Sequence, residues 1–386
     1  MPVGSKGAHG DSGPSGRSGH RIGLDIARVI AVGLVVVSHY VSGLQFIGVF
    51  GVELFFALSG YLIGRVLYQN LSPENDWSMT EVKNFWVRRW WRTLPNYYLF
   101  LVVFAVFHAF SGGLPKLSQF PDYLFFFQNL LQTPEGFYSV SWSLAIEEWF
   151  YLLFPLTIFA FTKTGLSRRK AVMWTIGLFL VVPPLLRLFA LQMASAVDVR
   201  QMTLPRLDAI FYGVAITFMV SRFEPGRRVR AALLMSSLAI LAFFFYRFAR
   251  NEVSEDVYTV AYVMLPLAFA MSLPWLEDMK PLSAAMRPLS TAISRISAWS
   301  FSIYLSHMPI LFTVYWLADD LRDSTLGNLV SKVVAFVICI VLSRLVFEKF
   351  EKPLTGLRPA QTSGRSAGRH SRAPSSKPDR DYLPVR

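Results

Sequence analysis

The residues that decide the fold are Leu24-Asp-Ile-Ala-Arg-Val-Ile-Ala-Val-Gly-Leu-Val-Val-Val-Ser-His39, an apolar stretch that carries three ionisable side chains. An ionised group at the centre of a bilayer costs roughly 2.5–3.5 kcal/mol, so such residues usually line a site or a path. At about 100° per residue, Arg28 and His39 share one helical face and lie about 16 Å apart along the axis. Asp25 falls on the same side, three residues before Arg28. The stretch therefore predicts a membrane helix with a polar stripe.

The composition of the whole chain agrees with a membrane protein. It is 53% hydrophobic and only 16% charged over 386 residues, which soluble domains of this size do not show. The net charge of +13 comes mostly from short loops beside apolar helices and from the two ends of the chain. That distribution is typical of membrane topology and anionic lipid, and argues against nucleic acid as a partner. The single cysteine, Cys339, excludes an intrachain disulfide and argues against a metal site.

Apolar segments long enough to cross a bilayer predict an all-α polytopic protein of about ten transmembrane helices. These segments are 24–43, 47–67, 94–112, 142–162, 171–191, 205–221, 231–247, 257–275, 299–317 and 327–347. The apolar piece at 121–131 is too short to span comfortably and contains Asp122, Gln128 and Asn129. We therefore expect it to be re-entrant or interfacial.

The distribution of Lys and Arg predicts the orientation of these helices. With ten crossings and the N-terminus in the cytoplasm, the inner loops hold fifteen Lys and Arg residues and the outer loops hold five. This bias predicts that both termini are cytoplasmic. The composition divides the chain into a membrane domain at 21–353 and two tails, 1–20 and 354–386, that we expect to be disordered.

His39 is the first candidate for chemistry, because an imidazole takes a proton from a hydroxyl near neutral pH. The topology returns Glu53, early in the second helix, to a similar depth, so we expect its carboxylate to orient His39. Farther along the chain, Arg88, Arg89 and Arg92 form a basic group interleaved with tryptophans just before the third predicted span. Guanidinium groups match phosphate bidentately, but taken alone the cluster is more typical of an ordinary cytoplasmic anchor.

Several segments resemble the acyltransferase 3 family of integral membrane acyltransferases. They are Arg21 to Arg28 followed by His39, Gly51 to Tyr61, Arg88 to Tyr97, Trp142 to Tyr151 with Glu147 and Glu148, Arg206-Leu-Asp208, and Tyr304 to His307. These motifs occur in the order of the family and span about residues 21–350.

The resemblance implies transfer of an acyl group, usually acetyl from acetyl-CoA in the cytoplasm, to a hydroxyl of a carbohydrate or related acceptor. It implies His39 as the catalytic histidine, Arg28 as the basic residue of its motif, and Arg88, Arg89 and Arg92 as contacts to the phosphates of CoA. The remaining motif residues become candidates for substrate binding: Glu147, Glu148, Arg206, Asp208 and His307. Acyl-CoA is then a cosubstrate rather than a bound cofactor, in a protein of the bacterial inner membrane.

Several alternatives stay open at this stage. A carrier or flippase could use Asp25, Arg28, His39 and Glu53 as a pathway for protons or substrate. A scaffold whose buried charges only pair helices is a further alternative. Within the acyltransferase hypothesis, His39 either deprotonates the acceptor for direct attack or is itself acylated first. The acceptor could be a polysaccharide, a lipid-linked glycan, peptidoglycan, a glycolipid or a small metabolite.

Overall fold

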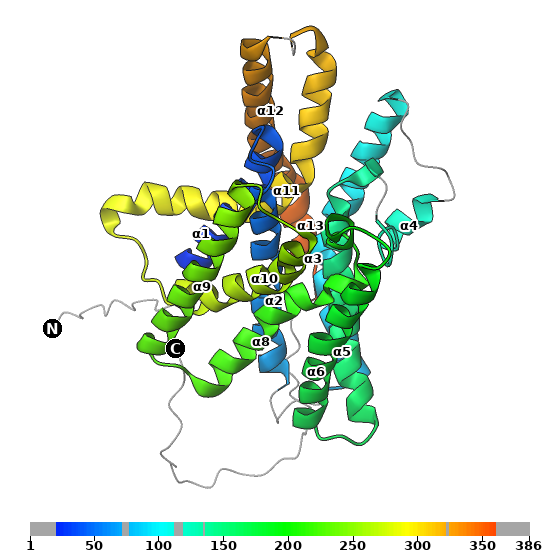
Figure 1. Cartoon of the computed structure of the whole chain (residues 1–386), viewed down its shortest axis with the longest axis vertical. Coiled ribbons are helices and arrows are strands. Elements are labelled where there is room, and N and C mark those ends of the chain that lie inside the picture. Colours follow the sequence, from blue (N-terminus) through cyan, green and yellow to red (C-terminus); the bar gives the residue numbers. More distant parts are fainter. Residues whose placement is uncertain (1–20, 72–76, 112–118, 134–135, 322–323, 360–386) are drawn as a thin grey trace, which may run out of the picture.

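The computed structural model describes residues 21–71, 77–111, 119–133, 136–321 and 324–359, and these residues form an all-helical bundle without strands (Figure 1). Each predicted span corresponds to one long helix of the described chain. These helices are α1 (Ile22–Tyr40), α2 (Ile47–Asn70), α3 (Met79–Ser111), α5 (Ser141–Lys163), α6 (Arg168–Ala190), α8 (Leu207–Phe223), α9 (Arg227–Ala249), α10 (Glu255–Glu277), α11 (Arg287–Leu317) and α12 (Thr325–Val346). The prediction of an all-α polytopic membrane protein is confirmed.

Shorter helical pieces connect and extend the long ones. They are α4 (Phe120–Leu124), α7 (Ala196–Val199), α13 (Lys352–Gly356) and a π-helical turn at Phe347–Glu351. The π turn and α13 continue the line of α12, so the expected tail boundary at residue 354 falls inside a helix and is wrong. The rest of the two predicted tails, 1–20 and 360–386, lies outside the described residues.

Nine helical segments in the described part of the chain are long and apolar enough to cross a membrane. Helix α11 is not one of them, although its second half matches the predicted span at 299–317. The reason is its buried face, which carries Ser300, Ser302, Tyr304, Ser306 and His307. These polar side chains lower the hydropathy of the segment while pointing into the bundle rather than toward lipid.

Two helices begin well before the predicted span. Helix α3 starts at Met79 rather than near 94, and α11 starts at Arg287 rather than near 299. The apolar criterion misses these first turns because they hold arginines, serines and tryptophans, which are acceptable in a helix but not apolar enough to count as a span. The basic group at Arg88, Arg89 and Arg92 therefore lies inside α3, not before it as expected.

The segment predicted to be re-entrant or interfacial contains the five-residue helix α4, which is too short to cross a bilayer. It is held against its neighbours by hydrogen bonds to its backbone carbonyls. The hydroxyl of Tyr97 donates to the Tyr123 carbonyl at 2.6 Å, and the indole of Trp149 donates to the Phe126 carbonyl at 2.8 Å. These bonds satisfy backbone groups that a membrane interior would leave unpaired.

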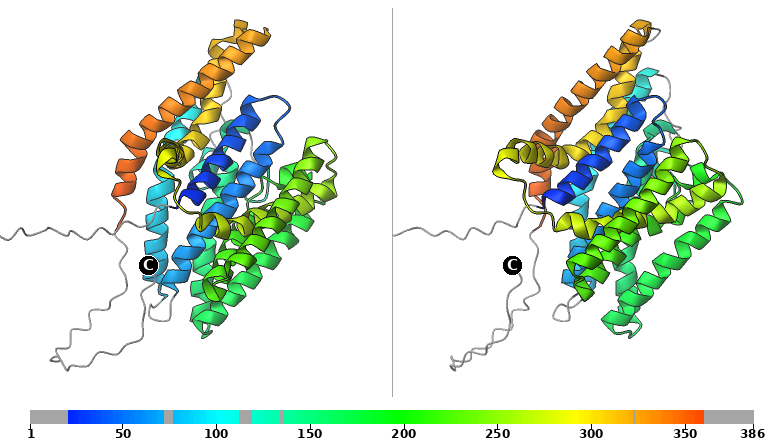
Figure 2. Two further views of the ribbon diagram at one scale, coloured as in Figure 1. Left: turned by 90° about the vertical axis from the view of Figure 1, so that its left-hand side faces the viewer. Right: turned by 60° about the vertical axis from the view of Figure 1, so that its left-hand side comes forward.

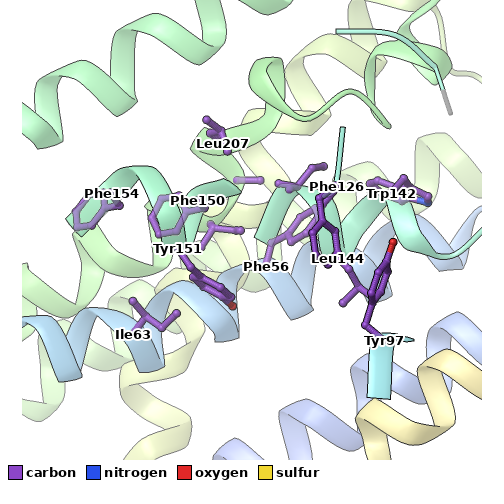
Figure 3. Packing of buried hydrophobic residues seen from close by; sticks show 14 of the residues in the cluster. Phe56, Ile63, Tyr97, Phe126, Trp142, Leu144, Phe150, Tyr151, Phe154 and Leu207 are labelled. Atoms are coloured by element: carbon purple, nitrogen blue, oxygen red, sulfur yellow. The ribbon is translucent and has the colours of Figure 1, made fainter. Parts of the chain in front are cut away.

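Helices α2 and α8 approach closely at the centre of the bundle. A Cβ atom built on Gly60 would lie 1.8 Å from the Ile210 carbonyl oxygen, and one on Gly213 would lie 2.2 Å from the Ala57 carbonyl oxygen. Small residues allow this contact, which is the usual way to pack helices where lipid supplies no hydrophobic driving force. Aromatic side chains from α2, α3, α5 and α8 fill the space beside it, including Phe56, Tyr97 and Phe150 (Figure 3).

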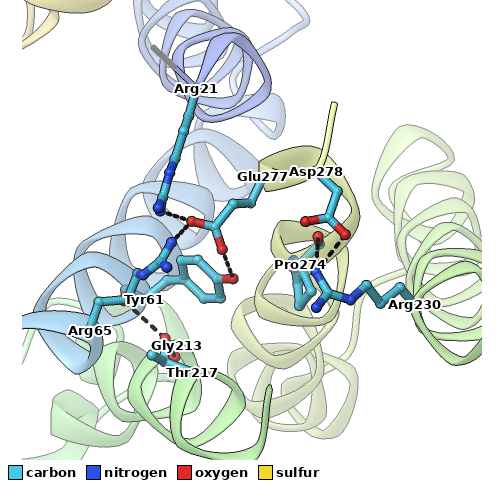
Figure 4. A network of polar contacts seen from close by, with 9 residues as sticks. All are labelled: Arg21, Tyr61, Arg65, Gly213, Thr217, Arg230, Pro274, Glu277 and Asp278. Atoms are coloured by element: carbon cyan, nitrogen blue, oxygen red, sulfur yellow. Dashed lines mark hydrogen bonds and ion pairs between the residues drawn. The ribbon is translucent and has the colours of Figure 1, made fainter. Parts of the chain in front are cut away.

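Charged groups join helix ends on the side where α1 and α11 begin and α2, α8 and α10 end. Glu277, at the end of α10, pairs with Arg21 and Arg65 and accepts a hydrogen bond from Tyr61 at 2.7 Å (Figure 4). Beside it, Arg230 pairs with Asp278 at 2.5 Å. The network ties the start of α1 to α2, α9 and α10 at the surface of the bundle.

We expect Gly60→Ala to destabilise the protein by about 1–3 kcal/mol, because its methyl group must displace the α8 backbone. The matched control is Gly177→Ala in α6, where a Cβ meets nothing within 4 Å. That substitution should leave stability unchanged or raise it, since alanine favours a helix. Thermal unfolding of the two purified variants in one detergent measures the difference. Equal melting temperatures would contradict the close α2–α8 contact.

Candidate functional site

A cavity of about 790 Å³ lies between α1, α2, α3, α5, α11 and the segment after α12. Its walls are strongly basic. Six cationic residues line it, and two carboxylates, Glu147 and Glu351, accompany them. The cations are Arg28, Arg88, Arg89, Arg92, Lys352 and Arg358. The excess of positive charge favours an anionic ligand, and guanidinium groups are well suited to phosphates.

Arg89 is held rigidly in the cavity wall. Its guanidinium lies 4.0 Å from the centre of the Tyr151 ring and hydrogen-bonds to the Tyr151 hydroxyl. The Tyr151 hydroxyl in turn donates to Glu147 at 3.0 Å, and Glu147 lies 3.7 Å from Arg89. The sequence places these two charges near opposite membrane surfaces. They meet because Arg89 is ten residues inside α3 and therefore about 15 Å from its start.

Arg28 faces the same cavity from α1, as the polar stripe predicts. Its guanidinium lies 3.3 Å from the Ser297 hydroxyl and 3.9 Å from the Asp25 carboxylate. Ser297 also donates to Asp25 at 2.7 Å, so the three side chains link α1 to α11. The predicted common face of Asp25 and Arg28 is thus confirmed. The partner on α11 was not foreseen, although α11 carries a run of regularly spaced serines.

Glu351 is a cavity residue that sequence reasoning missed. It lies at the end of the π turn, where its carboxylate accepts hydrogen bonds from Asn96 at 2.6 Å and Ser302 at 2.7 Å. A π turn contains one residue more than an α turn, and such turns are frequent at functional sites. The periodicity of an uninterrupted α-helix could not place Glu351 on the inner face.

His39 lies at the end of α1, outside the cavity wall, and packs against His307; its side chain is exposed, whereas that of His307 is fully buried. The centres of the two imidazole rings are 5.1 Å apart, and Tyr304, which lines the cavity, lies 5.9 Å from the His307 ring. The Tyr304 hydroxyl is 2.6 Å from the Ser143 hydroxyl, another cavity residue. The structure thus joins His39 and His307, two motif residues 268 positions apart, and separates them from the cavity by a tyrosine–serine contact.

Backbone carbonyls fix the orientation of both imidazoles. The Nδ1 atom of His39 is 2.9 Å from the Val35 carbonyl oxygen, and that of His307 is 2.6 Å from the Tyr304 carbonyl oxygen. A carbonyl only accepts hydrogen bonds, so each Nδ1 carries a hydrogen, and in the neutral imidazole the lone pair is then on Nε2. The Nε2 of His307 is buried without a hydrogen-bond partner among the described residues. Both rings therefore present Nε2 as a base or nucleophile.

The expectation that Glu53 orients His39 is wrong. Glu53 is fully buried and binds Arg206 at 2.5 Å, while Arg206 also donates to the Tyr262 carbonyl at 2.7 Å. A carboxylate that cannot reach water binds the nearest available cation, and Arg206 lies directly beside it. The Val35 carbonyl orients His39 instead.

Three other motif residues lie outside the cavity wall. Arg206 and Asp208 have no exposed surface, and Asp208 pairs with Arg187 of α6. Glu148 is buried beside Thr93, a residue of the cavity wall, but unlike its neighbour Glu147 it does not itself line the cavity. Consecutive helical residues differ in direction by about 100°, which explains the split between the two glutamates. As placed here, Arg206 and Asp208 hold helices together, and they do not contact the cavity described above.

Comparison with known proteins assigns the family. The family described as the acyltransferase domain matches residues 21–346. The chain belongs to the acyltransferase 3 family. The chain is similar to the peptidoglycan O-acetyltransferase OatA of Listeria monocytogenes, with 25% identity over 352 residues that cover 86% of this chain and 55% of that protein.

Two further relatives resemble this member of the family. A putative O-acetyltransferase of Staphylococcus aureus is 25% identical over 76% of this chain and 51% of that protein. The putative peptidoglycan O-acetyltransferase YrhL of Bacillus subtilis is 36% identical over 149 residues, which cover 35% of this chain and 23% of that protein. The chain thus spans about half the length of the first two relatives. No solved structure matches it.

A structural role for Arg206 can be separated from a role in substrate binding. We expect Arg206→Met to lower stability by about 3–5 kcal/mol, because it leaves the Glu53 carboxylate buried without its cation. Adding Glu53→Leu should recover most of this loss, since no lone charge remains. Thermal unfolding of both variants tests the effect. A double variant as unstable as Arg206→Met would contradict the pairing.

Proposed function

We propose that this acyltransferase is a membrane O-acetyltransferase that moves an acetyl group from cytoplasmic acetyl-CoA to a hydroxyl of a cell-envelope glycan. The single observation that carries the proposal is the basic cavity, whose six cations suit the phosphates of CoA. Its volume of about 790 Å³ lies within the range of about 300–1,000 Å³ typical of ligand pockets. The printed names of the relatives support a glycan acceptor, with peptidoglycan the first to test.

The exposure of the cations indicates where the two parts of acetyl-CoA, its phosphates and its pantetheine arm, would bind. Arg88, Arg92 and Arg358 have partly or fully exposed side chains, so they are available to bind the phosphates. Arg89 is committed to Tyr151 and Glu147 and shapes the wall between them. The pantetheine arm then extends past Phe55 and Ser59 toward Tyr304 and Ser143. Its thioester approaches the two histidines from the cavity side.

In the proposed reaction, Nε2 of His39 accepts the proton of the acceptor hydroxyl while the oxygen attacks the thioester carbonyl. A tetrahedral intermediate forms and the carbon–sulfur bond then breaks. The thiolate of CoA leaves and takes up the proton from the imidazolium. Alternatively Nε2 attacks the thioester first and passes the acetyl group to the acceptor in a second step. The free lone pair on Nε2 serves both routes, and we leave the choice between them open.

One observation argues against the carrier hypothesis. That hypothesis requires Glu53 beside His39 in a continuous pathway, but Glu53 is bonded to Arg206. Asp25 and Arg28, moreover, contact Ser297 in the wall of the cavity. We therefore retain the acyltransferase proposal alone, with both termini in the cytoplasm as the distribution of Lys and Arg predicts.

The decisive test is release of free thiol from acetyl-CoA by the purified protein in liposomes, with peptidoglycan fragments as acceptor. We expect His39→Ala to reduce acceptor-dependent release by at least about a hundredfold, since a general base contributes roughly 10²–10⁴ in rate. His108→Ala, which removes an imidazole packed against Phe107 and Phe137, is the control and should retain activity. Turnover by His39→Ala at the wild-type rate would overturn the assignment.

A second prediction concerns the affinity for acetyl-CoA. Arg88→Ala should raise the KM for acetyl-CoA by about tenfold or more, because a hydrogen bond to a charged group is worth about 1.5–3 kcal/mol. Little change in kcat is expected, since the side chain of Arg88 donates to the Pro359 carbonyl at 2.8 Å, in the segment after α12, and not to either histidine. Lys83→Ala, an exposed position on the same helix outside the cavity, is the control. An unchanged KM for Arg88→Ala would make the arginine cluster a topological anchor instead.

A further inference from the structure

A second groove, of about 550 Å³, lies next to the donor cavity, between the first half of α11 and the end of α12. It too is basic. Four cations line it, namely Arg287 and Arg295 from α11, Arg344 from α12 and Lys352 from α13. The accompanying carboxylate, Glu348, already accepts a hydrogen bond from Arg344 at 3.0 Å. The other three cations, Arg287, Arg295 and Lys352, therefore have no carboxylate partner among the residues that line the groove.

Two of the three hydroxyls that line the groove are already used within α11. The Thr291 and Ser294 hydroxyls donate to carbonyls of their own helix, both at 2.9 Å. Their hydrogens are thus unavailable to a ligand. Arg287, Arg295 and Lys352 are all exposed. The three exposed cations favour an anion with several acceptor oxygens, such as a phosphate.

The surroundings of the groove identify the source of that phosphate. Immediately before the groove, α12 exposes Val341, Leu342 and Leu345, an apolar surface of the kind that contacts lipid chains. The Arg344 guanidinium lies 6.0 Å from the centre of the Trp299 ring, and tryptophan is enriched at the level of lipid headgroups. Figure 1 shows the first part of α11, in yellow, turning away from the direction of the rest of the helix. The groove thus lies where a membrane helix ends and an interfacial stretch begins.

We propose that this groove binds the headgroup phosphate of an anionic phospholipid. Arg287, Arg295 and Lys352 contact the phosphate, and the lipid chains lie along the exposed apolar face of α12. Binding itself does not depend on the proposed enzymatic function. The groove differs from the donor cavity in its walls, which come from α11, the end of α12 and the segment after it, whereas α1, α2, α3 and α5 also line the donor cavity.

The bound lipid would also support the donor cavity. Ala298, Phe347 and Lys352 line both spaces, so they form a shared wall. Phe347 begins the π turn that ends at Glu351, which is held in the donor cavity by Asn96 and Ser302. A phosphate that fixes Lys352 therefore fixes the residue directly after that turn. This consequence, unlike binding, rests on the proposed function.

The test measures lipid binding by the full-length protein in detergent, by titration with short-chain phosphatidylglycerol or phosphatidylcholine. The variant is Arg287→Gln with Arg295→Gln. The matched control is Arg169→Gln with Arg228→Gln, two exposed arginines outside the groove. We expect the groove variant to bind phosphatidylglycerol about tenfold to thirtyfold more weakly than wild type, since each cation near an anionic surface contributes roughly a fivefold factor. The control should bind as wild type does.

Each other outcome overturns the proposal. Equal losses in both double variants would mean that only overall charge matters. Equal binding of phosphatidylglycerol and phosphatidylcholine would remove the preference for an anionic lipid. Displacement of the lipid by adenosine 3′,5′-bisphosphate, abolished in the groove variant, would make the groove a nucleotide site. Because the readout is binding, failure of the acetyltransferase proposal would leave this result interpretable, and unchanged elution on size exclusion confirms that the variants fold.

Discussion

The bond between Glu53 and Arg206 is the interaction on which the arrangement of the bundle depends. Neither side chain has any exposed surface, and each would be costly to bury alone. Because Arg206 also binds the Tyr262 carbonyl, this one guanidinium joins α2, the start of α8 and α10. The glycine contact between α2 and α8 lies farther along the same pair of helices. Once α2 is fixed in this way, its opposite face, with Phe55 and Ser59, is free to form the cavity wall.

Much of the fold could be predicted because a membrane imposes simple rules on sequence. Apolar length identified all ten long helices, and helical spacing placed Asp25 and Arg28 together. The rules fail where polar residues continue a helix, as at the starts of α3 and α11. They also fail to assign partners among several buried charges. Glu53 lies at a depth that suited His39, but depth alone does not identify which cation or imidazole is the neighbour.

The sequence could predict which residues belong to the candidate site, but not which of them contact one another. The motifs identify His39, His307, Arg28 and the arginines of α3, and the structure brings each of them to the cavity or to the pair of histidines beyond it. Spacing within one helix cannot show that Arg89 meets Glu147, or that Tyr304 separates the cavity from the histidines. Those contacts depend on helix rotation and relative depth, which are set by packing between helices distant in sequence.

The π turn at Phe347–Glu351 makes chain length, and not only residue type, a property of the cavity wall. Such a turn is equivalent to one residue inserted into a helix, and it offsets every following side chain by about 100°. Removing one residue there would restore an ordinary helix while rotating Lys352 and Arg358 away from the cavity. This corner of the protein is therefore sensitive to the deletion of a single residue, and related chains should keep its length unchanged.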